Sequence, residues 1–246
     1  MLSICAVRHG EAPFYAINAD ATHDAASTVK TAVLAALYRS GTDLDVAVPV
    51  HDRFASQVPG RSFHLRADED SDPIPWRRIG GRATVRWLAE RMITHSSNLA
   101  AGLCVERIGL EPVARVLQDM GISGTRMARL PGDDPAREAG AANQVTAAGF
   151  ARLLLALRPD ELNLLERNTF RDDLPIGLPA GARVAVKNSW GHHLRHSGAL
   201  VFPPDAPPYA LAVCYTGPLA NGRAVGDPAA RLLARVSAQV WSRRRY

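Results

Sequence analysis

The segment STVKTAVLAALYRS, residues 27–40, decides how this chain is interpreted. Its apolar residues repeat at helical spacing, which predicts a helix that begins near Ser27 and ends at Ser40-Gly41. Almost no polar side chain interrupts it between Lys30 and Tyr38, so we expect the helix to be buried nearly all round. Burial disfavours the charged form of a lysine, so Lys30 could act as a proton acceptor.

Ser27 and Lys30 stand three positions apart and should share one face of this helix. At the helix start, the Ser27 hydroxyl lies near the positive end of the helix dipole, which favours an attacking or anionic oxygen. The same pattern also fits an N-cap serine followed by a solvated lysine, which is its common structural role. The apolar neighbours of Lys30 favour the catalytic interpretation.

Strands are expected on both sides of the chain's helical middle. The predicted strands are 2–8, 13–19, 182–189, 197–203 and 209–216, with a break between the third and fourth at Gly191-His192-His193. The predicted helices, besides the one at Ser27, are 83–93, 98–109, 111–120, 146–157 and 227–242. This order predicts an α+β fold with one sheet built from both termini. The expected division is an α/β lobe of residues 1–45 and 182–246 and a helical lobe of residues 46–181.

Bulk composition excludes several classes of protein. The chain has 246 residues and a formal net charge of +5, part of it in Arg243–Arg245 at the C-terminus, which we interpret as a solvated end and not as a nucleic-acid-binding tail. No stretch is long and apolar enough for a membrane span. No signal peptide is visible, which predicts a cytoplasmic protein unless the N-terminus is truncated. Three widely spaced cysteines indicate buried small side chains and no disulfide framework.

Two further motifs carry chemistry. His95-Ser96-Ser97-Asn98 directly follows a predicted helix, and Lys187-Asn188-Ser189 leaves an apolar strand. With Ser27 and Lys30, they supply a nucleophile, further hydroxyls, an amide and a second cation. This set is suited to acyl transfer to a small-molecule or peptide-like substrate that bears a carboxylate.

Taken in order, Ser-x-x-Lys, Ser-Ser-Asn and a strand-borne lysine resemble the motifs of the class A β-lactamase and penicillin-binding-protein superfamily. The resemblance covers residues 2–242. It implies a β-lactamase/transpeptidase-like fold with a five-stranded antiparallel sheet and an all-helical lobe. It also implies a serine hydrolase without a metal or other cofactor, and we expect a monomer or weak dimer.

The resemblance also implies roles for single residues. Ser27 would attack the carbonyl carbon of the substrate, and Lys30 would help to deprotonate the Ser27 hydroxyl. Ser96 would pass a proton to the leaving nitrogen, with Lys187 adjusting the acidity of the Ser96 hydroxyl. The backbone N–H groups of Ser27 and Ser189 would form the oxyanion hole. The implied substrate-binding side chains are Asn98, Asn188, Ser189, Arg195 and His196.

The chain departs from the family pattern at three places. Ser97 replaces the aspartate of the second motif, and Asn188-Ser189 replaces the Thr-Gly of the third. The loop 129–143 lacks the Glu-x-x-Leu-Asn pattern whose glutamate activates the deacylating water. Asp133, Asp134 and Glu138 are its only acids and therefore the candidates for that role. An acyl-enzyme with this loop should deacylate slowly, as in a penicillin-binding protein or slow hydrolase.

Other interpretations stay open. The altered motifs could leave a catalytically weak or silent β-lactam- or peptide-binding protein on the same scaffold. Arg8-His9-Gly10-Glu11 resembles the opening of the histidine phosphatases, although a hairpin turn also explains it. His192, His193 and His196 could hold zinc, but no carboxylate or cysteine lies nearby, and we expect no metal. The acidic run Asp68-Glu69-Asp70 is expected to be solvated surface.

Overall fold

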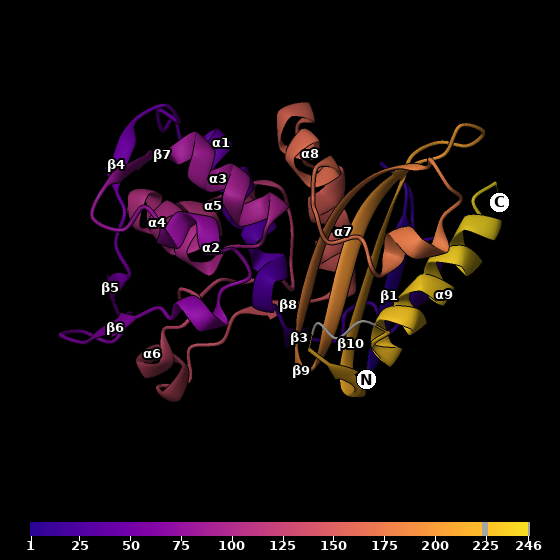
Figure 1. The fold of residues 1–246 in the computed structure, drawn as a ribbon. Helices are drawn as coiled ribbons and strands as arrows, with labels where there is room; N and C mark the ends of the chain where they lie inside the picture. The colour runs from indigo at the N-terminus through magenta and orange to yellow at the C-terminus, as the bar shows by residue number, and fades with distance from the viewer. Residues whose placement is uncertain (223–225, 246) are drawn as a thin grey trace.

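The computed structural model describes residues 1–222 and 226–245 (Figure 1). Its strands are β1 (Leu2–Val7), β2 (Tyr15–Ile17), β3 (His23–Asp24), β4 (Ala47–Pro49), β5 (Arg53–Ala55), β6 (Ser62–His64), β7 (Arg82–Thr84), β8 (Gln144–Val145), β9 (Arg183–Phe202) and β10 (Tyr209–Asn221). Its α-helices are α1 (Lys30–Arg39), α2 (Pro73–Trp76), α3 (Val85–Thr94), α4 (Asn98–Ile108), α5 (Glu111–Asp119), α6 (Asp134–Glu138), α7 (Ala147–Leu155), α8 (Pro159–Glu166) and α9 (Pro228–Ser242). Short 3-10 helices are η1 (Ala26–Val29), η2 (Ala67–Glu69) and η3 (Leu174–Gly177).

The main sheet joins the two ends of the chain, as predicted. Its strand order is β2-β1-β10-β9 and all pairings are antiparallel, with Ile4 opposite Val213 and Leu211 opposite Ala199. The predicted count of five strands is wrong, because the sheet has four. The strands expected at 182–189 and 197–203 belong to one element, β9, which also includes Gly191-His192-His193.

β9 nevertheless cannot be straight. Asn188 and Ser197 both hydrogen-bond to the carboxylate of Asp173, whereas nine residues of straight strand would separate them by about 30 Å. His193 adopts a left-handed φ of 57°, and the N–H of Gly222 bonds to the carbonyl of Gly191. The expected break is therefore a turn within β9, and it folds Lys187-Asn188-Ser189 back against Arg195-His196.

Both faces of the sheet are covered. Figure 1 shows α7 against one face and α9 against the other. Along β1, Cys5 and Val7 join the core on the α7 side, while Ile4 and Ala6 join the core on the α9 side, as the two-residue period of a strand requires. Burial on both faces explains why the β10 sequence is nearly all apolar. Gly198 lets Phe150 of α7 approach, because a Cβ there would lie 2.4 Å from its ring.

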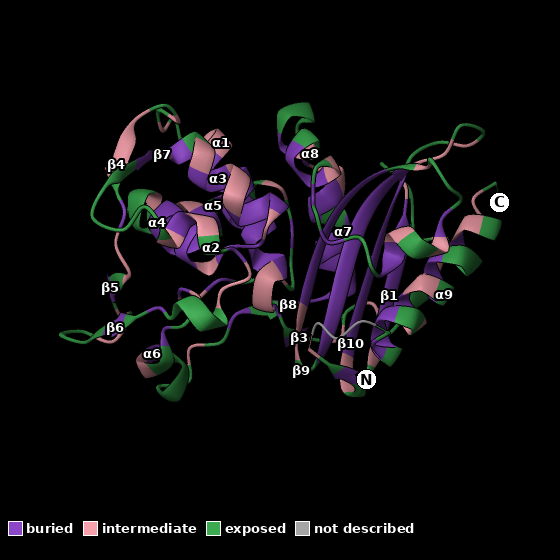
Figure 2. Ribbon diagram, in the orientation of Figure 1, coloured by how far each residue is buried: buried purple, intermediate pink, exposed green. Residues whose placement is uncertain are grey.

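Helix α1 is the centre of the helical part. Residues 30–37 of α1 are all buried, and α1 packs against α3, α4 and α5 (Figure 2). This confirms the expectation of a helix buried nearly all round. One apolar cluster runs from these helices through α7 to the sheet, so α1 and α7 link the two predicted lobes. The three cysteines are free and buried, as expected.

Within residues 1–222 and 226–245, no helix has the length and apolar character that crossing a membrane requires.

Candidate active site

Ser27 lies in η1, directly before α1, on a tightly shaped entry segment. β3 pairs with β8, and the Asp24 carboxylate then accepts a hydrogen bond of 2.8 Å from the Ala26 N–H. Ala26 adopts a left-handed φ of 40°. This turn leaves Ser27 partly exposed at the helix start, while Lys30, one turn later, is only 1% exposed. The pair therefore combines an accessible hydroxyl with a buried amine.

The Lys30 ammonium is surrounded by oxygen acceptors. It donates to the carbonyl of Ser96, to Asn98 Oδ1 at 2.8 Å, and more weakly to Ser96 Oγ at 3.4 Å. Burial lowers the pKa of Lys30 to about 7, although the Asp70 carboxylate acts in the opposite direction. Near neutral pH, a large share of Lys30 is therefore a neutral amine that can accept a proton.

Ser96 links Lys30 to the second lysine. Its hydroxyl accepts a hydrogen bond of 2.9 Å from Lys187 Nζ, and its backbone holds a left-handed φ of 57°. Lys187 is fully buried. Burial is the main reason that its pKa lies well below the usual value, and repulsion from Lys30 lowers the pKa further, whereas the Asp173 carboxylate raises it. The structure thus brings Lys30, Ser96 and Lys187 together around one hydroxyl.

Ser189 contacts the backbone of the nucleophile Ser27. Its hydroxyl accepts a hydrogen bond of 3.0 Å from the backbone N–H of Ser27. Sequence reasoning expected this N–H to stabilise a substrate oxyanion. The structure shows that the Ser189 side chain occupies this donor.

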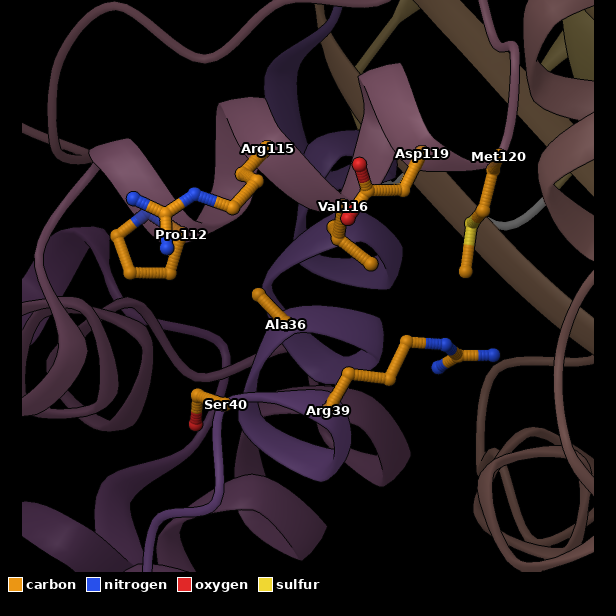
Figure 3. A pocket seen from close by; sticks show the side chains of 8 residues that line it. All are labelled: Ala36, Arg39, Ser40, Pro112, Arg115, Val116, Asp119 and Met120. Atoms are coloured by element: carbon orange, nitrogen blue, oxygen red, sulfur yellow. The ribbon is translucent and has the colours of Figure 1, made fainter.

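Ser27 and Lys30 line a cleft of about 280 Å³ together with Asn98, Arg129 and Trp190. Arg129 comes from the loop 129–143, and Trp190 follows Ser189 on β9. The hollow in Figure 3, about 380 Å³, is a different site at the end of α1 against α5, lined by Arg39, Arg115 and Asp119 among others. None of the residues predicted from the motifs lines that second hollow.

Of the predicted substrate-binding residues, Asn98 lines this cleft, whereas the other four are buried and held by other groups: Asn188, Ser189, Arg195 and His196. Arg195 is fully buried and pairs with Asp172 at 2.9 Å and Asp173 at 3.4 Å. Asn188 donates to the carbonyl of Phe170 at 3.0 Å and to Asp173 at 3.2 Å. These side chains support β9 from within the protein.

His196 is also buried. Its Nδ1 accepts from the Tyr215 N–H, so Nε2 carries the proton and donates to the carbonyl of Asp24 at 2.8 Å. Burial lowers the pKa of His196 to about 4, which keeps the ring neutral near pH 7. His196 therefore anchors the turn before Ser27 and does not offer a cation to a substrate.

The structure does not bring the candidate deacylation acids to Ser27. Asp133 is buried as the N-cap of α6 and accepts from Ser56 Oγ at 2.6 Å and from the Gln57 N–H. Asp134 and Glu138 are exposed, and Asp134 pairs with Arg137. Among the described residues that line the cleft, the one acid is Asp24.

The remaining sequence motifs make local contacts in the described part of the chain. His192 and His193 stack edge to face at 4.0 Å, apart from the buried His196, and the described residues contain no cluster of three potential metal ligands. Arg8 donates to the carbonyl of Arg244 at 2.7 Å and to Glu11 in the β1–β2 turn. At the C-terminus, Arg244 and Arg245 both pair with Asp205, so this basic end folds back onto the protein.

Asp70 is a candidate site residue that sequence reasoning missed, because it lies in a run interpreted as solvated surface. Its carboxylate accepts from Ser97 Oγ at 3.1 Å and from the N–H groups of Asn98 and Leu99 at 3.0 and 2.9 Å. It also accepts from Trp76 Nε1 at 2.9 Å. A carboxylate from outside α4 therefore fixes its first turn, next to the position where Ser97 replaces the family's aspartate. The absence of this aspartate from the second motif was the sequence signal that an acid from elsewhere in the chain could take its place.

We expect Asp70→Asn to lower both stability and acylation. The carboxylate is part-buried at a helix N-terminus, and weakening its hydrogen bonds should cost about 1–3 kcal/mol and loosen Ser96 and Asn98. Thermal melting and acylation rate measure the two effects. Asp68→Asn is the matched control, because Asp68 is exposed and pairs with Arg66. The double variant Asp70→Ser with Ser97→Asp should restore part of the thermal stability and part of the acylation rate. If Asp68→Asn lowered both as much as Asp70→Asn does, Asp70 would not be the residue that fixes the first turn of α4.

Comparison with known proteins finds matches over nearly the whole chain. The model of the β-lactamase enzyme family matches residues 2–243. An ancestral class A β-lactamase superposes with a TM-score of 0.77 at 25% identity, covering 99% of this chain and 94% of that one. A β-lactamase from Xanthomonas campestris pv. campestris gives 0.78 at 23% identity, covering 98% and 90%. PBP-A gives 0.76 at 18% identity, covering 99% and 90%, and a PBP-A variant is known as an acyl-enzyme complex with penicillin G.

No curated protein matches the sequence. The matched family model nevertheless spans nearly the whole chain, and the solved structures share its fold from end to end. The chain therefore belongs to the β-lactamase enzyme family.

Proposed function

We propose that this protein is a serine hydrolase that forms an acyl-enzyme on Ser27 with a β-lactam or a related amide or ester, and that it releases the acyl group slowly. The observation that carries the proposal is the buried group of Lys30, Ser96 and Lys187 beside the partly exposed Ser27. Two amines with lowered pKa values around one hydroxyl form a proton relay.

In the proposed reaction, Ser27 Oγ attacks the carbonyl carbon and its proton passes to the neutral amine of Lys30. Backbone N–H groups, that of Ser27 among them, stabilise the oxyanion. When the C–N bond breaks, Ser96 Oγ gives its proton to the leaving nitrogen and is reprotonated from Lys30, to which it is hydrogen-bonded. Lys187 holds the Ser96 hydroxyl in place.

Slow deacylation is supported by the composition of the cleft. Hydrolysis of the ester needs a base that activates water on the open side of Ser27. The acids of the loop 129–143 are a buried helix cap and two exposed side chains. Asp24, the acid in the cleft lining, already accepts a hydrogen bond from its own turn.

A second candidate function is a β-lactam- or peptide-binding protein with little or no acyl transfer. The observation that favours it is the hydrogen bond from the Ser27 N–H to Ser189 Oγ, which occupies an oxyanion-hole donor. Such a protein would bind the same ligands without forming an adduct.

Mass spectrometry after incubation with penicillin G tests the proposal. The intact protein should gain the mass of one penicillin, located on the peptide with Ser27, and Ser27→Ala should gain none. Ser40→Ala is the control, because Ser40 lies at the opposite end of α1 and should leave labelling unchanged. A chromogenic cephalosporin then measures turnover, which should be much slower than the first acylation. An adduct that persists in Ser27→Ala, or no adduct with any activated ester, would contradict the proposal.

A further inference from the structure

Arg129 is a cleft residue to which the sequence analysis gave no role. It lines the same hollow as Ser27 and Lys30 but belongs to another segment, the loop 129–143. The Asn143 side chain fixes its backbone: Oδ1 accepts from the N–H groups of Ala128 and Arg129 at 2.8 and 3.1 Å, and Nδ2 donates to the Arg129 carbonyl at 3.0 Å. The position of Arg129 is therefore built into the loop.

The guanidinium of Arg129 is oriented but not neutralised. Its Nε donates to the carbonyl of Ala141 at 3.0 Å and its Nη1 to the carbonyl of Leu130 at 3.3 Å. Both acceptors are uncharged, and among the described residues no carboxylate lies within ion-pairing distance of Arg129. One edge of a partly exposed guanidinium is thus left for an anion.

No other cation of the site can easily serve a substrate carboxylate. Lys30 and Lys187 are buried, with lowered pKa values, and are hydrogen-bonded to Ser96. Arg195, the cation expected for this role, is fully buried between Asp172 and Asp173. Arg129 is therefore the cleft-lining cation, within the described part of the chain, that lies partly open to a ligand and has no carboxylate partner there.

We propose that Arg129 binds the carboxylate of the acyl donor, and that the enzyme selects substrates whose anionic group lies on the loop side of Ser27. This inference rests on the proposed function, since it names the substrate feature that the same cleft recognises. Guanidinium and carboxylate match as a two-bond pair. Arg129 is thus a specificity-determining residue.

A chromogenic cephalosporin and its methyl ester form the matched pair of probes. Wild type should acylate with the free acid faster, by about tenfold or more in the second-order rate constant, as expected for a charge-assisted pair in a partly buried cleft. Arg129→Gln should remove this preference by slowing the acid alone, and Arg129→Lys should retain part of it. Arg137→Gln is the control, because Arg137 lies in the same loop but is exposed and pairs with Asp134.

The test separates this inference from acyl transfer itself. Equilibrium binding of the two probes to Ser27→Ala should show the same preference for the acid, and adding Arg129→Gln should remove it. If Arg129→Gln slows or weakens both probes equally, Arg129 only stabilises the loop and the inference is wrong. If binding shows the preference but wild type forms no adduct, the inference stands and the hydrolase proposal fails.

Discussion

Replacing Lys30 by alanine is expected to slow acylation of Ser27 by about 10²–10⁴-fold, the usual contribution of a catalytic base. The amine is buried, has a pKa lowered to about 7, and is held by Asn98 and Ser96 one helical turn from the nucleophile. Alanine removes the acceptor for the Ser27 proton but keeps the helix. Time-resolved mass spectrometry of the penicillin adduct measures the rate.

The pH dependence gives an independent check on Lys30. A base acts in its deprotonated form, so the acylation rate should rise as the pH increases through about 7 and level off above it. Below that value Lys30 is an ammonium that cannot accept a proton. Lys30→Arg keeps the charge but cannot deprotonate, so it should be as slow as alanine. Normal acylation by Lys30→Ala, or a flat profile in wild type, would assign the base elsewhere.

Local patterns predicted most of the fold, because each of these elements carries its own signal. The stretch 27–40 is apolar on every face, which indicated a buried helix, and the structure has one there. β9 shows where this reasoning fails. Gly191-His192-His193 separates two apolar runs in the sequence, and the backbone turns there, yet both runs belong to one strand element of twenty residues. The number of strands therefore depended on hydrogen bonding that the sequence does not display.

In the candidate site, too, local sequence patterns predicted some residues, and only the fold reveals the others. Ser27 and Lys30 were predictable because three-residue spacing puts them on one helix face, and the motif order then supplied Ser96 and Lys187. On a strand, alternate side chains face opposite ways. Lys187 faces Ser96 and Ser189 faces Ser27. Asn188, between them, must then face the opposite way, toward the buried Asp173, and period two could have shown this. Asp70 and Arg129 are far from the motifs in the sequence. Only the fold brings Asp70 into contact with Ser97 and places Arg129 in the cleft with Ser27.

Ser189→Gly is expected to accelerate acylation by about tenfold, and by no more than about 10³-fold, which is the largest usual contribution of one oxyanion-hole donor. In the structure the Ser27 N–H donates to Ser189 Oγ at 3.0 Å, so a substrate carbonyl must first displace this hydroxyl. Glycine frees the donor before the substrate arrives. Adduct formation with penicillin G under pre-steady-state conditions measures the gain.

Two further substitutions separate the hydroxyl from the bulk of the side chain. Ser189→Ala keeps the Cβ but removes the oxygen, so it should match most of the gain if occupation of the Ser27 N–H is the cause. Ser189→Thr keeps the hydroxyl and should show no gain. If alanine instead slows acylation, the hydroxyl itself helps to stabilise the oxyanion and does not compete with it. If alanine creates an adduct in a protein that otherwise forms none, this hydrogen bond is what keeps the site silent, because Lys30, Ser96 and Lys187 are then already competent.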